Sequence, residues 1–153
     1  MNKYEQLISG SDDNIIIIEK HFKSKAKGLC NGNKIGISKS IGTSVEKACV
    51  LAEELGHYHT TVGNITDLEN PQNRKQERQA RLWAYNKLIG LMGLINAYEQ
   101  GCRTRHDVAE YLDVTEEFLQ EAVDCYREKY GECVTVGSYY ILFIPSLAVG
   151  KII

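Results

Sequence analysis

Three side chains in one short segment of the sequence could together bind a metal ion and activate water. Residues 51–59 read LAEELGHYH, in which Glu53 and His57 are four positions apart. On a helix both side chains project from one face, with their heads within reach of one metal ion. Glu54 lies about 100° further round the helix, beside that face. A carboxylate and an imidazole are competent zinc ligands, and a neighbouring Glu can act as a general base on metal-bound water.

The same arrangement occurs in the H-E-x-x-H helix of zinc peptidases, with Glu53 here at the position of the first His. A catalytic zinc ion takes three protein ligands and leaves one position open for water. Glu77 follows His57 by twenty residues and falls on the next expected helix, from which gluzincin-type sites take their third ligand. We therefore expect Glu53, His57 and Glu77 as metal ligands and Glu54 as the general base.

Other interpretations of these residues stay open. E-E-x-x-H is a weak pattern, so Glu53, Glu54 and His57 could form an ordinary solvated helix face with an i,i+4 hydrogen bond. His59, near the end of the helix, could serve as a replacement ligand. Asp67, in the loop that follows, could do the same.

The sequence resembles the ImmA/IrrE family of metallo-endopeptidases in three stretches, which read LAEELGHYHTT, ERQARLWAYNKLI and DVAEYLDVTEEFLQEAVDCYREKYG. Family members carry an H-E-L-G-H helix, a downstream E-x-x-A helix and a helical segment of the LA-x-x-(F/L)-x-V-(S/T) kind. The likeness covers roughly residues 25 to 150. It implies that Glu54 is the general base, that His57 and Glu77 are metal ligands, and that Glu53 stands at the first-ligand position.

The resemblance also implies a function. Members of the family relieve repression in phages and other mobile elements, and in stress responses, by cleaving a helix-turn-helix repressor encoded close by. We therefore expect a cytoplasmic, metal-dependent endopeptidase that hydrolyses a peptide bond in a repressor-like protein. The alternative is a catalytically weak relative that regulates its repressor by binding, without cleavage.

Glu in place of the first His changes the charge of the expected metal centre. A Zn²⁺ ion held by two His and one Glu has a formal charge of +1, whereas Glu53, His57 and Glu77 would leave it neutral. A lower charge makes a weaker Lewis acid, so bound water should be acidified less than the pKa of about 7 that strong zinc sites reach. The harder oxygen ligands also shift the preference towards Mn²⁺ or Fe²⁺.

Composition limits the classes of protein to which the chain can belong. Its 153 residues are 43% apolar and 25% charged, with a formal charge of -2. These values fit one folded domain and exclude a disordered chain and a strongly basic nucleic-acid binder, although a local basic patch is still compatible with them. The longest apolar run, residues 15–18, is too short for a membrane span or a signal peptide. Five cysteines without a C-x-x-C pair favour reduced thiols.

The first half of the chain should form a small sheet and a capped helix. Asn31-Gly32 is a strong hairpin signal before a strand at residues 34–39, and residues 15–18 could be a strand or a helix. Thr43 and Glu46 form a capping box for a helix that should end near residues 60–63. Gly56 inside that helix suggests the close approach of a neighbouring strand.

A long helix should follow between Pro71 and Gly101, the second of which is a natural C-cap. Two shorter helices joined by a tight turn should occupy residues 104–130, in the shape of a helix-turn-helix. The second of these carries acidic residues where a DNA-recognition helix needs cations or amides, so we expect no DNA binding and favour a packing or substrate-docking role. Residues 133–147 should form a terminal strand pair.

We thus expect an α+β, zincin-like metallopeptidase fold with a small antiparallel sheet and a helical, helix-turn-helix-like C-terminal part. Residues 1–100 would form the zincin-like core. Residues 101–153 would add a helical segment and a terminal strand packed on that core in a single compact unit. The expected partner is a protein substrate, a helix-turn-helix repressor, and no membrane partner is expected.

Overall fold

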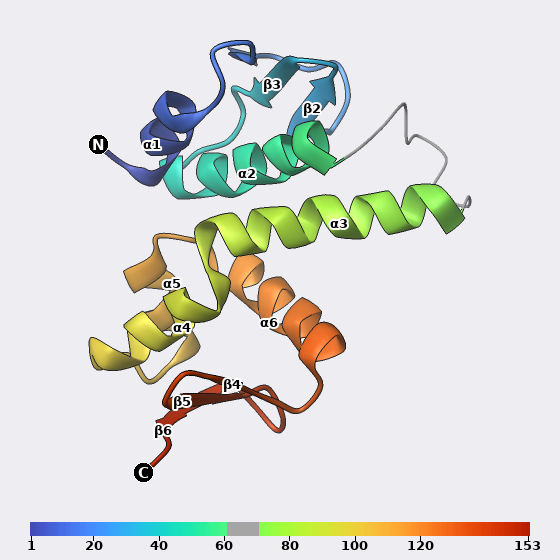
Figure 1. Cartoon of the computed structure of the whole chain (residues 1–153). Helices are drawn as coiled ribbons and strands as arrows, with labels where there is room; N and C mark the ends of the chain where they lie inside the picture. Colours follow the sequence, from blue (N-terminus) through green and yellow to red (C-terminus); the bar gives the residue numbers. More distant parts are fainter. Residues whose placement is uncertain (61–70) are drawn as a thin grey trace. The chain divides into compact units, whose positions relative to one another are not determined.

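The computed structural model describes residues 1–60 and 71–153 of the chain. These residues form two compact units, Met1–Ala84 and Tyr85–Ile153, and their helices and strands are labelled in Figure 1. The boundary between the units falls inside helix α3 (Pro71–Leu88). Each unit combines helices with a three-stranded sheet, so the expected α+β class is confirmed.

The sheet of the first unit has the order β1-β3-β2, with strands β1 (Ile16–Lys20), β2 (Gly28–Asn31) and β3 (Lys34–Ser38). Strands β2 and β3 form the expected antiparallel hairpin, in which Gly32 supplies the positive φ of the turn. Strand β1 pairs with the other side of β3 and runs parallel to it, where Ile16 N donates to Asn33 O at 2.8 Å. The sheet is therefore mixed, and the expected antiparallel pairing holds only for β2 and β3.

Two helices complete the described part of the first unit before α3 begins. Helix α1 (Lys3–Gly10) starts with a capping box between Asn2 and Glu5, and it packs against α2 (Ser44–Thr60). Helix α2 also contacts β2 and β3, and Ile35 and Ile37 of β3 are fully buried. This side of the sheet and the apolar side of α2 make the core of the unit.

The second unit begins with the last turn of α3 and continues into α4 (Gly90–Glu99). The long helix expected between Pro71 and Gly101 is therefore wrong in one respect, because it is two helices. The chain leaves helical geometry at Ile89, and Gly90 has a φ of 67°. This left-handed backbone conformation is accessible to glycine at little cost. Gly101 ends α4 as expected.

Helices α5 (Arg105–Leu112) and α6 (Glu116–Tyr130) form the expected pair of short helices joined by a tight turn. Thr104 and Thr115 cap their N-termini, and Asp113 ends α5 in the left-handed conformation. Tyr126 of α6 is fully buried, and its hydroxyl lies 2.9 Å from Asn86 Oδ1. Burial raises the pKa of this tyrosine well above its ordinary value.

The C-terminal residues form an antiparallel sheet of β4 (Cys133–Val136), β5 (Tyr139–Leu142) and β6 (Ala148–Lys151), in that order. The expected strand pair is β4 and β5, and β6 adds a third strand on the other side of β5. Ile141 and Phe143 from this region are buried. All five cysteines are free.

Candidate metal centre

Helix α2 carries most of the expected site residues, and its start is set by a local signal. Thr43 Oγ1 accepts a hydrogen bond from Glu46 N at 3.1 Å, which satisfies one free donor of the first turn. The buried face of α2 contains Ala48, Leu51 and Ala52. Since this face is fixed in the core, the partly exposed Glu53, Glu54 and His57 are held at defined angles around the helix.

Helix α3 approaches α2 closely at a glycine, Gly56. A Cβ atom on Gly56 would lie only 2.2 Å from the carbonyl oxygen of Ala80. The backbones of the two helices therefore meet here, and Gly56 marks the approach of a helix where the sequence suggested a strand. Ala80 is fully buried, so both helices present small residues at this point. Glu77 lies nearly one turn before Ala80 and next to His57, the neighbour of Gly56.

His57 and Glu77 are the two expected ligands that the structure brings together. His57 Nε2 lies 3.3 Å from Glu77 Oε2, and Arg81 Nε lies 3.4 Å from the other oxygen of Glu77. The hydrogen bond with Glu77 raises the pKa of His57, and the same bond, with the charge of Arg81 in addition, lowers the pKa of Glu77. Both side chains are largely buried, so their contact is only partly screened by solvent.

The distance between His57 and Glu77 tests whether the pair suits a metal. Two ligand atoms bound at about 2.0–2.1 Å in a tetrahedral zinc site lie about 3.3 Å apart. The measured 3.3 Å between Nε2 and Oε2 fits two neighbouring ligand positions of such a site. Within residues 1–60 and 71–153, however, no three metal-ligating side chains are already grouped around one point. Glu53 as the third ligand therefore stays a prediction.

Glu54 lies between α2 and the edge of the first sheet. A Cβ atom on Gly28 of β2 would lie 2.9 Å from Glu54 Cγ, so the absence of a side chain at Gly28 leaves the room that Glu54 occupies. The pKa of Glu54 is raised to about 7, chiefly by burial; the charge of His57 opposes this rise, and the charges of Glu53 and Glu77 contribute to it. A carboxyl group with a pKa near neutrality can both accept and release a proton under ordinary conditions.

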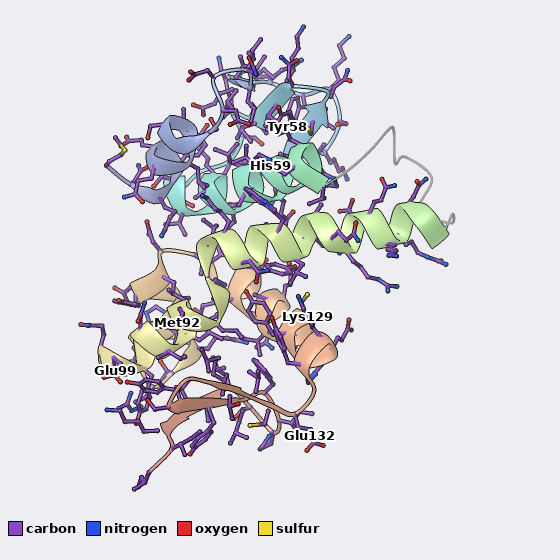
Figure 2. All side chains as sticks on the ribbon, in the orientation of Figure 1. Tyr58, His59, Met92, Glu99, Lys129 and Glu132 are labelled. Atoms are coloured by element: carbon purple, nitrogen blue, oxygen red, sulfur yellow. The ribbon has the colours of Figure 1, made fainter. Side chains whose placement is uncertain are left out.

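The two replacement ligands considered from the sequence have different outcomes. His59 is exposed, and its ring stacks on that of Trp83 with centroids 4.8 Å apart. Figure 2 labels His59 and Tyr58 at the end of α2. The stacking gives His59 a packing role against α3. Asp67 lies outside the described residues.

Sequence reasoning missed three residues that shape this site. Arg81 follows Glu77 by four positions on the same helix, a spacing that could have predicted the ion pair. Gly28 leaves room for Glu54, but an isolated glycine at the start of a strand gives no such signal. Cys30 also lies on β2. Burial raises the pKa of its thiol to about 11, and the negative charge of the nearby Glu54 contributes to this rise. That thiol is therefore protonated and a weak nucleophile.

Comparison with known protein families gives a match over most of the chain. The model of the M78 peptidase family, described as the IrrE N-terminal-like domain, matches residues 14–124. The chain belongs to this family. M78 proteins are metallopeptidases, which are hydrolases that use a metal ion and act on proteins. No curated protein and no solved structure matches the chain. In the described part of this M78 chain, no helix has the length and apolar character needed to cross a membrane.

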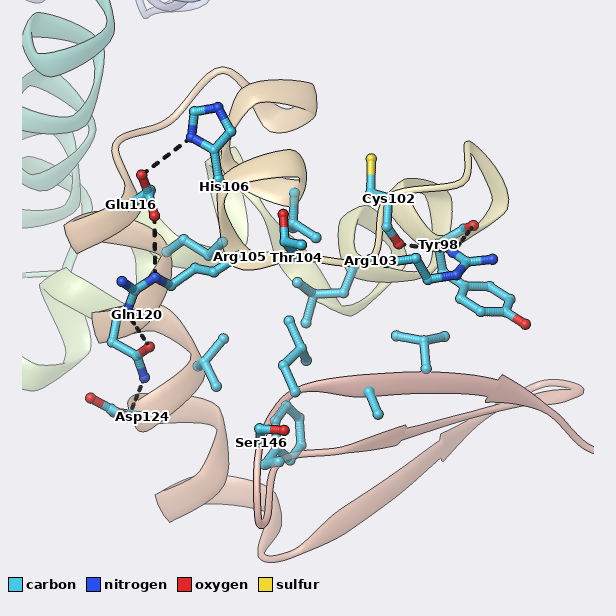
Figure 3. A pocket seen from close by; sticks show the side chains of 18 of the residues that line it. Tyr98, Cys102, Arg103, Thr104, Arg105, His106, Glu116, Gln120, Asp124 and Ser146 are labelled. Atoms are coloured by element: carbon cyan, nitrogen blue, oxygen red, sulfur yellow. Dashed lines mark hydrogen bonds and ion pairs between the residues drawn. The ribbon is translucent and has the colours of Figure 1, made fainter.

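The second unit of the M78 chain contains a cavity of about 730 Å³ that none of the four expected site residues lines. Figure 3 shows its polar wall, in which Arg105 lies between Glu116 and Gln120, and Gln120 contacts Asp124. His106 Nδ1 also lies 3.3 Å from Glu116 Oε2. The cations at the start of α5 are therefore paired with carboxylates of α6, which reduces the positive charge that this helix pair could offer to DNA.

Proposed function

We propose that this chain is a metal-dependent endopeptidase that cuts a helix-turn-helix repressor, with Glu54 as its general base. The observation that carries the proposal is the contact of His57 with Glu77 beside Glu54, on two helices whose backbones meet at Gly56. Family membership supplies the reaction class. The residues of this chain supply the assignment of roles.

His57 and Glu77 would hold the metal ion, with Glu53 as the third ligand from the preceding turn of α2. Bound there, a divalent metal such as Zn²⁺, Mn²⁺ or Fe²⁺ supplies Lewis acidity towards the scissile carbonyl. Arg81 holds the second oxygen of Glu77, as the outer partners of metal-ligating carboxylates do. This contact orients Glu77 towards His57.

Glu54 would move the proton during hydrolysis. Its carboxylate takes a proton from the attacking water and then gives that proton to the leaving amine nitrogen, so it returns to its starting state after each cut. Its position against Gly28 puts the carboxyl group beside the edge strand β2. The free side of β2, which pairs with no other strand in the described part of the first unit, could hold the substrate backbone in an extended form.

The second candidate function is regulation of the repressor by binding alone. The specific observation that favours it is Glu53, because a site of one His and two Glu is electrically neutral around a divalent metal and activates water less. The same surface could then bind a repressor and keep it from its operator without cutting it. The two functions differ only in whether a peptide bond breaks.

Replacing Glu54 with Gln separates these functions. The metal-loaded protein is incubated with the helix-turn-helix repressor encoded beside its gene, and the products are analysed by mass spectrometry. For Glu54→Gln we expect the rate of cutting to fall by roughly 10²–10⁴-fold, with a matched Glu128→Gln variant on α6 unaffected. If Glu54→Gln relieves repression in cells as well as the unmodified protein does, hydrolysis is not the mechanism and the binding function holds.

A further inference from the structure

Positive charge is concentrated in the stretch that forms the first sheet. Residues 16–39 contain six lysines and a single carboxylate, that of Glu19, which gives the stretch a formal charge of +5. Because the whole chain carries -2, its remaining residues carry -7. All six lysines are exposed. The net charge of the whole chain is thus close to zero, but this stretch carries a local excess of positive charge that can attract an anionic partner.

Five of these lysines gather at one end of the sheet, which we call the lysine end (Lys20, Lys23, Lys25, Lys27 and Lys39). Strands β1 and β3 run parallel and finish together, and Lys39 N donates to Lys20 O at 3.0 Å. At the same end Ser38 N donates to Lys27 O at 2.8 Å, because β2 begins where β3 finishes. Lys23 and Lys25 lie in the connection between β1 and β2. Figure 2 shows nitrogen-tipped side chains projecting outward from this sheet.

Carboxylates neutralise only part of the lysine end. Lys27 Nζ lies 2.5 Å from Glu46 Oε1. Glu19 forms an ion pair with Lys47, which is not part of the lysine end. The ammonium group of Lys20 lies 5.8 Å from the centre of the Phe22 ring. Among the described residues, no ion pair joins the other lysines of this end to a carboxylate. They are therefore free to meet a negative charge from another molecule.

The lysine end adjoins the proposed catalytic base. Lys27 directly precedes Gly28, the residue against which Glu54 lies. On the outer face of the same sheet, Leu29 and Ile18 are 52% and 49% exposed and stand opposite each other across Gly36. A substrate that runs along β2 past Glu54 would therefore contact exposed lysines at the start of β2 and an apolar surface beside them.

We propose that the lysine end is a docking surface for an acidic segment of the protein substrate. This inference rests on the proposed function, since it names the kind of sequence that the peptidase selects near the bond it cuts. The charge of the surface calls for an anionic partner. Its continuity with Glu54 through Gly28 favours a protein segment over a nucleic acid or a lipid surface, because a bound substrate must already extend away from Glu54.

Binding of two matched peptides to the full chain tests this proposal. The Glu54→Gln variant is used, so that no probe is cut, and binding is followed by fluorescence anisotropy. The first probe is a fluorescein-labelled peptide with several Glu among Ala, Leu and Ser, and the second has Gln at each of those positions. We expect the acidic probe to bind at least about fivefold more tightly at low salt, and this advantage to shrink as salt screens exposed charges.

A pair of double variants then locates the binding surface. Lys23→Gln with Lys25→Gln removes two exposed charges from a loop, and we expect it to weaken the acidic probe by roughly two- to twentyfold and leave the neutral probe unchanged. Lys87→Gln with Lys151→Gln removes two charges from the second unit as a control and should have no such effect.

Three results would overturn the proposal. The acidic and neutral probes could bind equally, or the loop variant could behave like the control variant. Alternatively, a single-stranded oligonucleotide or phosphatidylserine vesicles could bind more tightly than the acidic probe and lose that binding in the loop variant. Cutting is measured separately with unmodified protein. If the lysine end discriminates between the probes while no repressor is cut, the docking surface stands and the proposed hydrolysis fails.

Discussion

His57 Nε2 lies 3.3 Å from Glu77 Oε2, and this contact joins helix α2 to helix α3. Without a metal the two groups form a partly buried hydrogen-bonded pair, in which each favours the charged form of the other. With a metal the same separation suits two neighbouring ligands. One arrangement can therefore serve both states, and loading would need little movement of α2 or α3 at this point.

Replacing Glu53 with His tests the third ligand. The change would restore the two-His, one-Glu set common in zinc peptidases. If Glu53 is a ligand, we expect the variant to bind zinc at least about tenfold more tightly, since imidazole is a better zinc ligand than carboxylate at this position. Competition with a chromophoric chelator measures the affinity. An unchanged affinity would mean that Glu53 faces solvent; Glu128→His on α6 controls for added histidine.

Replacing Gly56 with Ala tests the close crossing of α2 and α3. The new methyl group would overlap the carbonyl oxygen of Ala80, and a backbone atom cannot move aside as a flexible side chain can. We expect a loss of about 1–3 kcal/mol in the free energy of unfolding, which exceeds the gain of about 0.5–1 kcal/mol that Ala gives over Gly in a helix.

Urea denaturation measures the effect of this substitution. Gly42→Ala is the matched control, because a Cβ atom there meets nothing within 4 Å. We expect that control to be neutral. A Gly56→Ala variant as stable as the unmodified protein would show that the helices do not meet at this residue.

The titration of His106 tests the electrostatics of the second unit. Its contact with Glu116 raises the pKa of His106 above the ordinary 6.5, and lowers the pKa of Glu116. The raised pKa of His106 stabilises the fold below pH 6.5, and this is lost as the pH rises through the folded-state pKa. The lowered pKa of Glu116 contributes stability above pH 4.5, its ordinary pKa, and this contribution is lost as the pH falls through the folded-state pKa of Glu116. The contact therefore contributes most to stability between the ordinary pKa of Glu116 and that of His106.

Proton NMR titration of the His106 ring measures this effect. We expect Glu116→Gln to bring the pKa of His106 back towards 6.5, and Glu110→Gln to lower it less, because the hydrogen bond with Glu116 is the largest cause. Both partners of the contact are exposed, so we expect only a small change in overall stability. A pKa that is the same in the Glu116→Gln variant would contradict the contact.

Local signals explain why much of the fold could be predicted from the sequence. Caps such as Thr43 and Thr115, and the turn at Gly32, act over a few residues and require no knowledge of the rest of the chain. The parallel pairing of β1 with β3 depends on contacts between strands that are not consecutive, and hydrophobic pattern does not report it. The break at Gly90 was missed because apolar residues continue on both sides of it.

The candidate site was predictable to the same degree. The i,i+4 spacing predicted Glu53 and His57 on one helix face with Glu54 beside it, and Glu77 was predicted from its separation from His57 and from the match to a family motif. The room that Gly28 leaves for Glu54, and the meeting of Gly56 with Ala80, arise from the packing of separate elements. Side-chain periodicity within one helix contains no information on such approaches.

The metal content of the purified protein tests the central claim, that His57 and Glu77 hold a metal ion. Protein prepared without chelator and supplemented with zinc, manganese or iron is desalted, and its metal is measured by mass spectrometry. We predict about one equivalent of metal in the unmodified protein and less than about 0.1 equivalent in His57→Ala and Glu77→Ala variants that keep their helix content. Less than about 0.1 equivalent of every metal in the unmodified protein would contradict the account.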